Sequence, residues 1–391
     1  MGAYRLTGPL SELDFLSYYH RIRSDPDFYA EKFGEQLFND SAYGHLANFL
    51  VDSFNPSSAY DIGCGKGKMV ESLRLLGVDA HGIDWSRYLL NQAPDNLQRY
   101  LDCGDLLDSV PDKKMDLVTC METLEHFPPT FVPQAISQLK KCCGDYIFVT
   151  IPSFGPNAYG PAGLQVLNKE WLDDAKNDRY FRHIVVDEED NPHHGHLTLA
   201  TYRWWTKQFL KAGLNRKPLK EAAFHALTGD FLKQHLWNIY ILQEITENFI
   251  NFNAGTDNQL GPGWFDQEFF NRDGKPIGIR WTGRKAICYL KTERQRRNLE
   301  LEFFSGPVQL LYDIELFITI FHCTLDKILR ERVPLIVPPE KWFTGTIAPG
   351  NMPPGILEVT IELKNPWISR HYTEYDDPRE LGVAVHSVSL Q

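Results

Sequence analysis

The sequence predicts an α/β protein in which a doubly wound, mostly parallel sheet is followed by a C-terminal antiparallel β-sandwich. Strand and helix patterns alternate from about residue 41, glycines follow the first short apolar run, and apolar and polar residues alternate with a period of two beyond residue 265. Alternating strands and helices are typical of a parallel sheet covered on both faces. A period of two is typical of half-buried antiparallel strands.

Length and composition limit the classes to which the protein can belong. The chain has 391 residues, of which 43% are hydrophobic, so it has enough apolar surface for two or three domains with full cores. Its formal net charge is −11, whereas nucleic-acid binders usually carry a basic surplus. We therefore expect no DNA partner and disfavour an RNA partner.

Neither the start of the chain nor its most apolar stretch predicts a membrane segment. The first residues lack an apolar signal segment. Residues 310–323 are too few to cross a bilayer and include Asp313 and Glu315. The odd count of seven cysteines, with no CxxC pair, favours reduced and buried thiols over a disulfide framework. We expect a cytoplasmic protein without a membrane span.

Residues 1–40 are predicted to form a helical, aromatic-rich cap. The aromatic residues are spaced so that they could line one face of a helix, and they are Phe15, Tyr18, Tyr19, Phe28, Tyr29 and Phe33. Two roles are open, a lid over a site or a cap over the edge of a sheet.

The first full domain is predicted over residues 41–246. Its short apolar runs predict strands over residues 59–62, 78–83, 117–120, 146–151 and 237–242, with a weaker strand pattern near 220–227. Helical patterns lie between these runs. One precedes Gly77 and another, over residues 202–210, precedes Gly213, and glycine commonly ends a helix.

The rest of the chain is predicted to hold a linker and the β-sandwich. Residues 247–265 are rich in Asn, Gly and Pro, which suits a linker. Within the predicted sandwich, residues 266–391, the alternation is clearest over 299–303, 312–320 and 357–363. No Ser-His-Asp arrangement or metal-ligand spacing occurs there, so we expect the chemistry in the first domain.

The most informative segment is the glycine loop after the first predicted strand. Residues 60–67 run Tyr-Asp-Ile-Gly-Cys-Gly-Lys-Gly, and glycines at such a turn let a ligand approach the backbone. A dinucleotide fingerprint would need its third glycine at position 68, which is Lys68. Asp61 would repel a pyrophosphate, so the segment favours a ligand that carries positive charge.

Further candidate residues follow the next strands at regular spacing. Asp84 and Trp85 end the second strand, and Asp105 and Leu106 follow the third. Cys120 lies in the fourth strand. Groups at the carboxyl ends of parallel strands share one rim, where open α/β sheets bind their ligands. Each acid alone is better explained as a solvated loop residue, but their order and spacing together indicate a binding site.

In these motifs the chain resembles the class I S-adenosylmethionine-dependent methyltransferases, over about residues 41–246. The resemblance implies a Rossmann-like sheet of seven strands, with an antiparallel last strand over 237–242, and S-adenosylmethionine as the cofactor. Asp61 would orient the methionine ammonium, Asp84 would hold the ribose and Asp105 would contact adenine. The other candidate cofactor-binding residues are Gly63, Cys64, Gly65, Gly67, Trp85, Leu106 and Cys120.

Two clusters could help an acceptor hydroxyl to lose its proton. The string Glu122-x-x-Glu125-His126 is similar to the metal-binding string of small-RNA 2′-O-methyltransferases and of the O-methyltransferases of ubiquinone synthesis. His196, in the histidine-rich run 193–196, best fits the place of a further ligand. The resemblance implies Mg²⁺ or Mn²⁺ held by Glu122, Glu125, His126 and His196.

The same string also recurs in relatives of this fold that bind no metal. If this chain binds no metal ion, His126, His194 or His196 would act as a direct general base, because histidine transfers protons well near neutral pH. The metal-assisted mechanism and the direct-base mechanism are both open.

A second resemblance concerns the C-terminal region. Residues 376–385, with 263–265 and 279–281, resemble β-sandwich modules attached to enzymes of bacterial surface-polysaccharide synthesis. This implies a sugar or glycan acceptor, with candidate glycan platforms at Trp264, Trp281, Trp342 and Trp367. A module that packs beside the first domain, or that forms a homo-oligomer, is the alternative.

We therefore predict an S-adenosylmethionine-dependent O-methyltransferase that acts on a hydroxyl of a sugar or glycan. One alternative is the same chemistry on a non-sugar small molecule such as a phenol or quinone precursor. Another is a catalytically silent protein that binds S-adenosylmethionine and mediates assembly.

Overall fold

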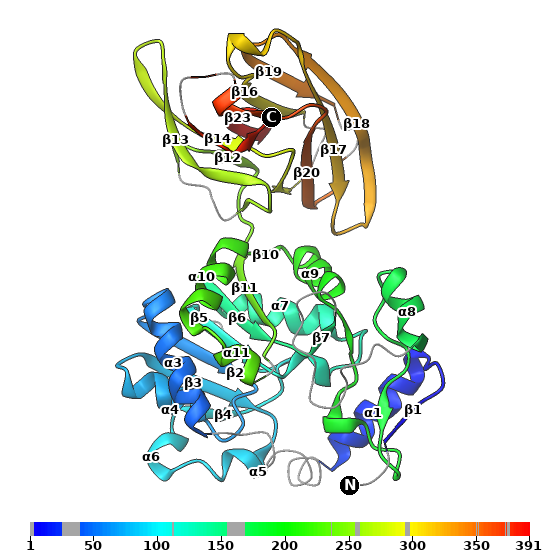
Figure 1. Ribbon diagram of the computed structural model, residues 1–391. Helices are drawn as coiled ribbons and strands as arrows, with labels where there is room; N and C mark the ends of the chain where they lie inside the picture. Colours follow the sequence, from blue (N-terminus) through cyan, green and yellow to red (C-terminus); the bar gives the residue numbers. More distant parts are fainter. Residues whose placement is uncertain are drawn as a thin grey trace. The chain divides into compact units, whose positions relative to one another are not determined.

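The computed structural model describes residues 4–25, 40–111, 113–154, 169–235, 237–254, 259–293, 298–348, 350, 352–371, 373 and 376–391. The chain divides into two compact units, shown in Figure 1. The first comprises residues 1–212 and 219–243, and the second comprises residues 213–218 and 244–391.

The first unit is organised by six strands, in the order β11-β6-β5-β2-β3-β4, of a seven-stranded sheet whose edge strand β10 lies within residues 213–218. The strands from β2 to β6 pair in parallel, whereas β11 is antiparallel to β6. This is the doubly wound arrangement that the sequence predicts, with the expected antiparallel strand. The bounds are β2 (Ser58–Ile62), β3 (Asp79–Asp84), β4 (Leu101–Cys103), β5 (Met115–Met121), β6 (Cys143–Thr150), β10 (Leu214–Arg216) and β11 (Ile239–Glu244).

Helices cover the sheet, which explains why its central strands are apolar along their length. α4 (Lys68–Leu75) packs on β2 and β3 and against α3 (Asp40–Phe54). α7 (Val132–Cys142) packs on β5 and β6 and against α9 (Tyr202–Lys211). The crossovers after β2 and β5 leave the centre of the sheet in opposite directions, so right-handed connections place these helix pairs on opposite faces.

Shorter elements complete the first unit. They are α5 (Arg87–Leu90), α6 (Asp95–Gln98), η2 (Leu124–His126), β7 (Ser153–Phe154), α8 (Lys169–Lys176), β8 (Val185–Val186), η3 (His193–Gly195), β9 (Ala200–Thr201), α10 (Pro218–Thr228) and α11 (Phe231–Gln234). β7 pairs with β9 in parallel.

The prediction of a strand near residues 220–227 is wrong, because this segment belongs to helix α10. Its buried residues Glu221, Phe224 and Thr228 are spaced by three and four, which places them on one helical face. Pro218 opens the helix, where its missing N–H costs no hydrogen bond. The strand that precedes β11 is instead the short β10.

The N-terminal segment contains β1 (Arg5–Leu6), which pairs with β8, and helix α1 (Glu12–Ser24). Ser11 caps α1 in a capping box, since the Ser11 backbone N–H donates to Asp14 Oδ2 at 2.8 Å while the Asp14 N–H donates to Ser11 Oγ. The helix buries Phe15, Tyr19 and Ile22. Phe28, Tyr29 and Phe33 of the predicted cap lie outside the described residues.

The second unit contains two larger antiparallel sheets. One has the order β13-β14-β23-β16-β19 with β12 paired to β23, and the other has the order β15-β20-β17-β18. The bounds are β12 (Phe249–Asn251), β13 (Trp264–Arg272), β14 (Lys275–Thr282), β15 (Lys285–Thr292), β16 (Leu299–Phe304), β17 (Ile314–His322), β18 (Lys327–Val337), β19 (Trp342–Ile347), β20 (Gly355–Leu363), β21 (Trp367–Ile368), β22 (Glu380–Leu381) and β23 (Ala384–Leu390).

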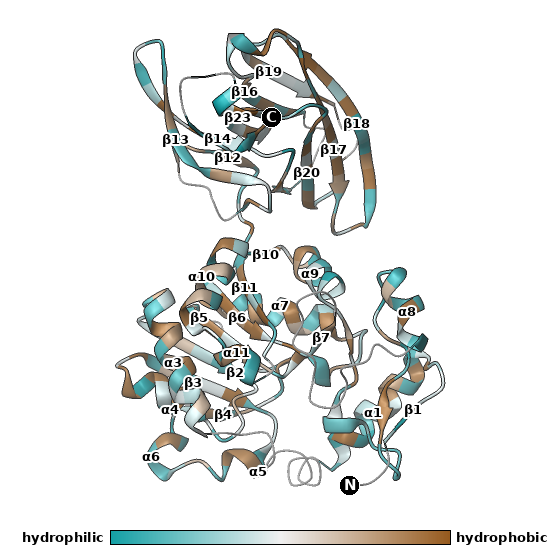
Figure 2. Ribbon diagram, viewed as in Figure 1, coloured by the Kyte–Doolittle hydropathy of each residue, from teal (hydrophilic) through white to brown (hydrophobic). Residues whose placement is uncertain are grey.

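The predicted alternation in this unit corresponds to real strands. Every second residue is buried along β16 and β17, and hydrophobic residues predominate along β17 in Figure 2. Buried side chains of both sheets, such as Phe303 and Ile318, belong to one hydrophobic cluster. Residues 249–251, inside the stretch that we predicted as a linker, form β12 and pair with β23.

Two of the predicted glycan platforms are core residues. Trp281 and Trp367 are buried and pack edge to face with ring centroids 5.4 Å apart. Trp264 and Trp342 are partly buried and pack against the same hydrophobic cluster. The need of the core for large apolar side chains therefore accounts for these tryptophans.

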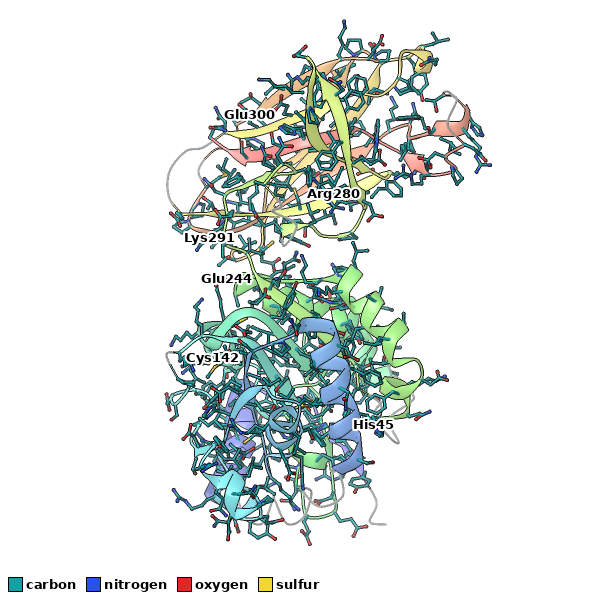
Figure 3. The ribbon with its side chains drawn as sticks, turned by 90° about the vertical axis from the view of Figure 1, so that its left-hand side faces the viewer. His45, Cys142, Glu244, Arg280, Lys291 and Glu300 are labelled. Atoms are coloured by element: carbon teal, nitrogen blue, oxygen red, sulfur yellow. The ribbon has the colours of Figure 1, made fainter. Side chains whose placement is uncertain are left out.

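The seven cysteines carry free thiols, and all except Cys103 are buried. Cys142, labelled in Figure 3, is one of the buried thiols and lies at the end of α7. Among the described residues, no helix has both the length and the apolar character that a membrane span requires.

Gly263 provides a test of the fold of the second unit. It has a φ of +94°, and an added Cβ would meet the Lys285 carbonyl oxygen and lie 2.8 Å from Ala286 Cα. We expect Gly263→Ala to lower the free energy of unfolding by more than about 3 kcal/mol, because backbone strain and a steric clash combine.

Gly274→Ala is the matched control. Gly274 has a φ of +78°, but no described atom lies within 4 Å of its added Cβ, so strain alone should cost about 1–2 kcal/mol. Both values are measured by urea unfolding of the second unit. Equal losses in the two variants would contradict the described packing around Gly263.

Candidate active site

The strands place the predicted site residues at one rim of the seven-stranded sheet. Ile62 pairs with Ile83 and with Cys120, and Asp84 pairs with Cys103, so β2, β3, β4 and β5 end at a similar level. The strand order reverses direction between β2 and β5. Ligands of open α/β sheets bind in the crevice at such a point.

The glycine loop is fixed by its backbone. Gly63, Gly65 and Gly67 have φ values of +76°, +53° and +75°, in the region that favours glycine. The Gly63 and Cys64 N–H groups both donate to the Ile83 carbonyl oxygen, at 2.9 and 3.0 Å. The loop is therefore held against the end of β3.

Asp84 is the acceptor that completes this arrangement. Its Oδ2 accepts the Gly65 N–H at 2.8 Å and its Oδ1 accepts the Ser86 N–H at 2.8 Å. Burial raises the pKa of Asp84, whereas the two backbone donors lower it. An ionised carboxylate has about four acceptor positions. Asp84 therefore has capacity to accept hydrogen bonds from ligand hydroxyls.

Asp61 is a second buried carboxyl group at this rim. Its Oδ1 accepts the Thr119 hydroxyl at 2.6 Å. Burial raises the pKa of Asp61 to about 7, the Thr119 hydrogen bond opposes this shift, and the negative charge of Asp84 adds to it. The charge of Asp61 therefore changes within the physiological pH range, and a nearby cation would favour its ionised form.

A small pocket collects part of the predicted cofactor-binding set, namely Gly63, Asp84, Trp85, Asp105 and Leu106. Asp105 accepts the Leu107 N–H at 2.9 Å and forms an ion pair with Arg23. The described lining of this pocket does not include Asp61, Cys64, Gly65, Gly67 or Cys120. Cys120 is fully buried within β5.

Sequence reasoning missed other residues that line the same pocket, and they are Arg23, Ile62, Ile83, Gly104, Thr123 and Phe127. Ile62, Ile83 and Gly104 flank motifs that were identified, so the same strand-end pattern could have found them. Arg23 contacts Asp105 across 82 positions of sequence. No local spacing signals such a contact.

The second cluster forms where η2 meets the loop after η3. Ligand atoms of Glu125, His126 and His196 all lie within 4.8 Å of one another. The Leu197 and Thr198 N–H groups donate to the Glu125 carbonyl oxygen at 2.8 and 2.9 Å. These hydrogen bonds bring together two motifs that lie about seventy residues apart.

Glu122, the fourth predicted metal ligand, is not in the three-residue group found among the described residues. Its φ is +46° and its carboxyl group is buried. Burial raises the pKa of Glu122 to about 7. Burial also raises the pKa of Glu125, and the neighbouring Glu122 raises it further.

The carboxyl group of Glu125 is buried without hydrogen bonds from the described residues that would offset the cost of burial. Its side chain is fully buried, and neither carboxylate oxygen has a hydrogen-bond partner in the described part of the chain. His196 Nε2 lies 3.8 Å from Glu125 Oε1. A buried carboxylate without partners is costly. Glu125 therefore either keeps a proton or faces a cation.

The histidines of the cluster are neutral at physiological pH. Burial lowers the pKa of His126 to about 4. Two carbonyl oxygens partly oppose this shift: Gly195 O lies 3.2 Å from His126 Nδ1, and Glu122 O lies 3.1 Å from Nε2. Burial also lowers the pKa of His194 and of His196. Neutral imidazoles can accept a proton or bind a metal ion.

His194 extends this cluster on its outer side. Its ring centroid lies 5.8 Å from that of His196 and 3.9 Å from that of His193. His194 has a φ of +55° within η3, so the backbone turns sharply at this position. The three predicted catalytic histidines therefore lie in one region, because the ring centroid of His196 lies 5.2 Å from that of His126 and 5.8 Å from that of His194.

Comparisons with known proteins agree with this description of the first unit. Residues 33–215 match a family model described as a methyltransferase domain. The ubiquinone biosynthesis O-methyltransferase of Methylococcus capsulatus is 40% identical over 102 residues, which cover 24% of this chain and 43% of that protein. The protein of the same name from Nitrosomonas europaea is 31% identical over 121 residues, covering 28% and 50%. The chain thus spans about half the length of the curated relatives it matches.

Similar solved structures include the plantazolicin methyltransferase BpumL and the magnesium protoporphyrin IX methyltransferase ChlM from Synechocystis PCC 6803. The first is 18% identical, covers 60% of this chain and 95% of that chain, and has a TM-score of 0.38. The second is 18% identical, covers 52% and 85%, and has a TM-score of 0.33.

The matched segment includes the glycine loop and the strands β2 to β6 around which the site is built. The seven strands, the antiparallel β11 and the position of the loop are those that the family resemblance implied. Residues 33–215 of this chain are therefore similar to a methyltransferase domain.

Proposed function

We propose that this protein is an S-adenosylmethionine-dependent O-methyltransferase whose acceptor is a hydroxyl group of a non-sugar small molecule. The observation that carries the proposal is the pair of buried carboxyl groups, Asp61 and Asp84, beside a glycine loop with left-handed backbone. This pair suits a ligand that has both hydroxyl groups and a positive charge, as the methyl donor does. A pyrophosphate would be repelled.

The proposed acceptor differs from the sugar or glycan that we predicted from the sequence. The relatives named above are ubiquinone biosynthesis O-methyltransferases, which favours the non-sugar alternative. The glycan prediction came from a resemblance of the C-terminal region to modules of polysaccharide-synthesis enzymes, and two of its candidate glycan platforms, Trp281 and Trp367, are buried in a hydrophobic core. Neither finding supports a glycan acceptor.

The donor would bind along the rim of the sheet. Asp84 would accept hydrogen bonds from the ribose hydroxyls, while Asp105 would accept one from the adenine amino group. Asp61 would attract the methionine ammonium. The backbone at 63–67 would allow close approach of the cofactor, because a side chain at Gly63 would clash with Thr123.

Methyl transfer to a hydroxyl needs alignment of the acceptor and removal of its proton. Neutral His126, His194 or His196 could accept that proton directly. Glu125, His126 and His196 also fit a divalent ion, because two unpaired, buried carboxylate oxygens lie beside two neutral imidazoles. A bound ion would lower the pKa of the acceptor hydroxyl.

For the second unit we propose a β-sandwich with an accessory role. Its two antiparallel sheets and the single hydrophobic cluster to which both contribute support this architecture. The chemistry is assigned to the first unit, which holds both clusters described above.

Asp84→Ala tests the cofactor site. We expect the affinity for S-adenosylhomocysteine, measured by isothermal titration calorimetry, to fall about 10- to 100-fold, since the ribose acceptor and the bond to Gly65 are both lost. Asp79→Ala is the matched control, because Asp79 begins the same strand and is exposed. Unchanged affinity in Asp84→Ala would contradict the assignment.

The pH dependence of donor binding tests Asp61. Below a pH of about 7 its carboxyl group is protonated and cannot attract the ammonium, so affinity should rise between pH 6 and 8. Binding near pH 7 should release a proton, which is measured by titration in buffers of different ionisation enthalpy. Asp61→Asn should remove most of this dependence. An identical pH profile in that variant would rule out Asp61 as the source.

Glu125→Gln tests the metal ion. If the ion is used, Mn²⁺ should bind to the wild type and far more weakly to Glu125→Gln, and chelation should abolish methyl transfer until Mg²⁺ or Mn²⁺ is added. His193→Ala should retain Mn²⁺ binding, because His193 lies outside the three-residue group. Full activity after chelation, with no Mn²⁺ binding, would favour the direct-base mechanism.

A further inference from the structure

The cavity at the predicted adenosine site is very small. It measures about 30 Å³ beside Asp84, Trp85 and Asp105. Small-molecule and cofactor pockets commonly measure about 300–1,000 Å³. The cavity is thus about one tenth of the smallest typical pocket, so side chains must move before an adenosine can bind there.

Arg23, in the last turn of α1, lines this cavity from an element outside the sheet. Its Nη2 forms an ion pair with Asp105 Oδ2. Its guanidinium carbon lies 4.5 Å from the ring centroid of Trp85 and 5.5 Å from that of Tyr19. The side chains of Arg23 and Asp105 are 26% and 19% exposed, so the pair is largely shielded from solvent.

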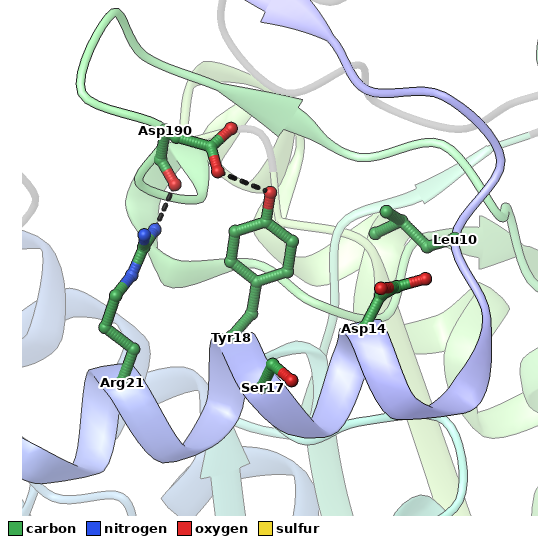
Figure 4. A pocket seen from close by; sticks show the side chains of 6 residues that line it. All are labelled: Leu10, Asp14, Ser17, Tyr18, Arg21 and Asp190. Carbon is green, nitrogen blue, oxygen red and sulfur yellow. Dashed lines mark hydrogen bonds between the residues drawn. The ribbon is translucent and has the colours of Figure 1, made fainter.

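The contacts of α1 hold Arg23 in this position. Tyr19 packs edge to face on Phe131, with ring centroids 5.5 Å apart. On another side of the helix, Tyr18 donates to Asp190 Oδ2 at 3.0 Å and Arg21 donates to the Asp190 carbonyl oxygen, as Figure 4 shows. Contacts on both sides of the helix therefore fix the place of Arg23.

We propose that Arg23 occupies the adenine part of the cofactor site and competes with the cofactor for Asp105 and Trp85, so that α1 gates cofactor binding. This inference rests on the proposed function. A guanidinium is planar, carries several donors and stacks on aromatic rings. The Arg23 guanidinium thus pairs with Asp105 and stacks on Trp85, the two groups that an adenine with its amino group would contact.

The proposed competition predicts the direction in which the cofactor affinity changes when the Arg23 side chain is removed. If Arg23 must leave Asp105 before the cofactor binds, the apparent affinity is reduced by the fraction of molecules in which Arg23 is already displaced. Removing the side chain should therefore strengthen cofactor binding. If Arg23 instead held the bound cofactor, removing it would weaken binding.

The test compares Arg23→Ala with the wild type, using S-adenosylhomocysteine as the probe. We expect about ten-fold tighter binding by titration calorimetry and a correspondingly faster association by stopped-flow measurement. Arg23→Lys keeps the charge but loses the planar stack, so it should fall between the two. Lys169→Ala removes an exposed cation that does not line the pocket, so this variant should bind as the wild type does.

Equal or weaker binding by Arg23→Ala, with wild-type binding intact, would overturn the competition but leave the proposed function standing. Failure of both the wild type and Arg23→Ala to bind S-adenosylhomocysteine or S-adenosylmethionine would contradict the proposed function itself. Binding by Arg23→Ala alone would support the competition strongly. Thermal unfolding of each variant verifies that the first unit is folded.

Discussion

The hydrogen bond from the Gly65 N–H to Asp84 Oδ2 is the interaction on which the candidate site depends. It joins the turn after β2 to the end of β3, and it requires a backbone conformation that glycine adopts without strain. Because the same carboxylate also accepts the Ser86 N–H, one buried side chain positions the loops after two adjacent strands. The crevice at the sheet rim follows from this constraint.

The rim also concentrates carboxyl groups that burial makes costly. Asp61, Asp84 and Glu125 are all buried, and for each of them burial raises the pKa. In the interior of a protein such groups either hold protons or face cations. A sulfonium donor with its ammonium group, and a divalent ion beside Glu125, would supply the missing positive charge. The electrostatics of the two clusters thus point to the same chemistry.

Local patterns were sufficient to predict much of this structure. The strands β2, β3, β5 and β6, the glycine loop and Asp84 each carry a signal within a few residues of sequence. The strand prediction failed at α10 because two of its three buried residues, Glu221 and Thr228, are polar, so the apolar residues alone do not show the helical period. The three-residue β12 was missed because it depends on its partner β23 rather than on its own composition.

Contacts between distant segments were beyond the reach of such patterns. Arg23 reaches Asp105 only because α1 packs where it does, and the grouping of Glu125 with His196 depends on backbone bonds to residues 197 and 198. Glu122 was predicted as a ligand from its spacing. It is not among the three described residues whose ligand atoms lie within 4.8 Å of one another, but its charge contributes to the raised pKa of Glu125.

A crystal structure of the protein with S-adenosylhomocysteine tests the central claim most directly. The account predicts ribose hydroxyls within hydrogen-bonding distance of Asp84, the adenine amino group at Asp105, and the Arg23 side chain turned away from Trp85. Density for the nucleoside elsewhere in the molecule, or a phosphate-bearing ligand preferred at the glycine loop, would contradict it.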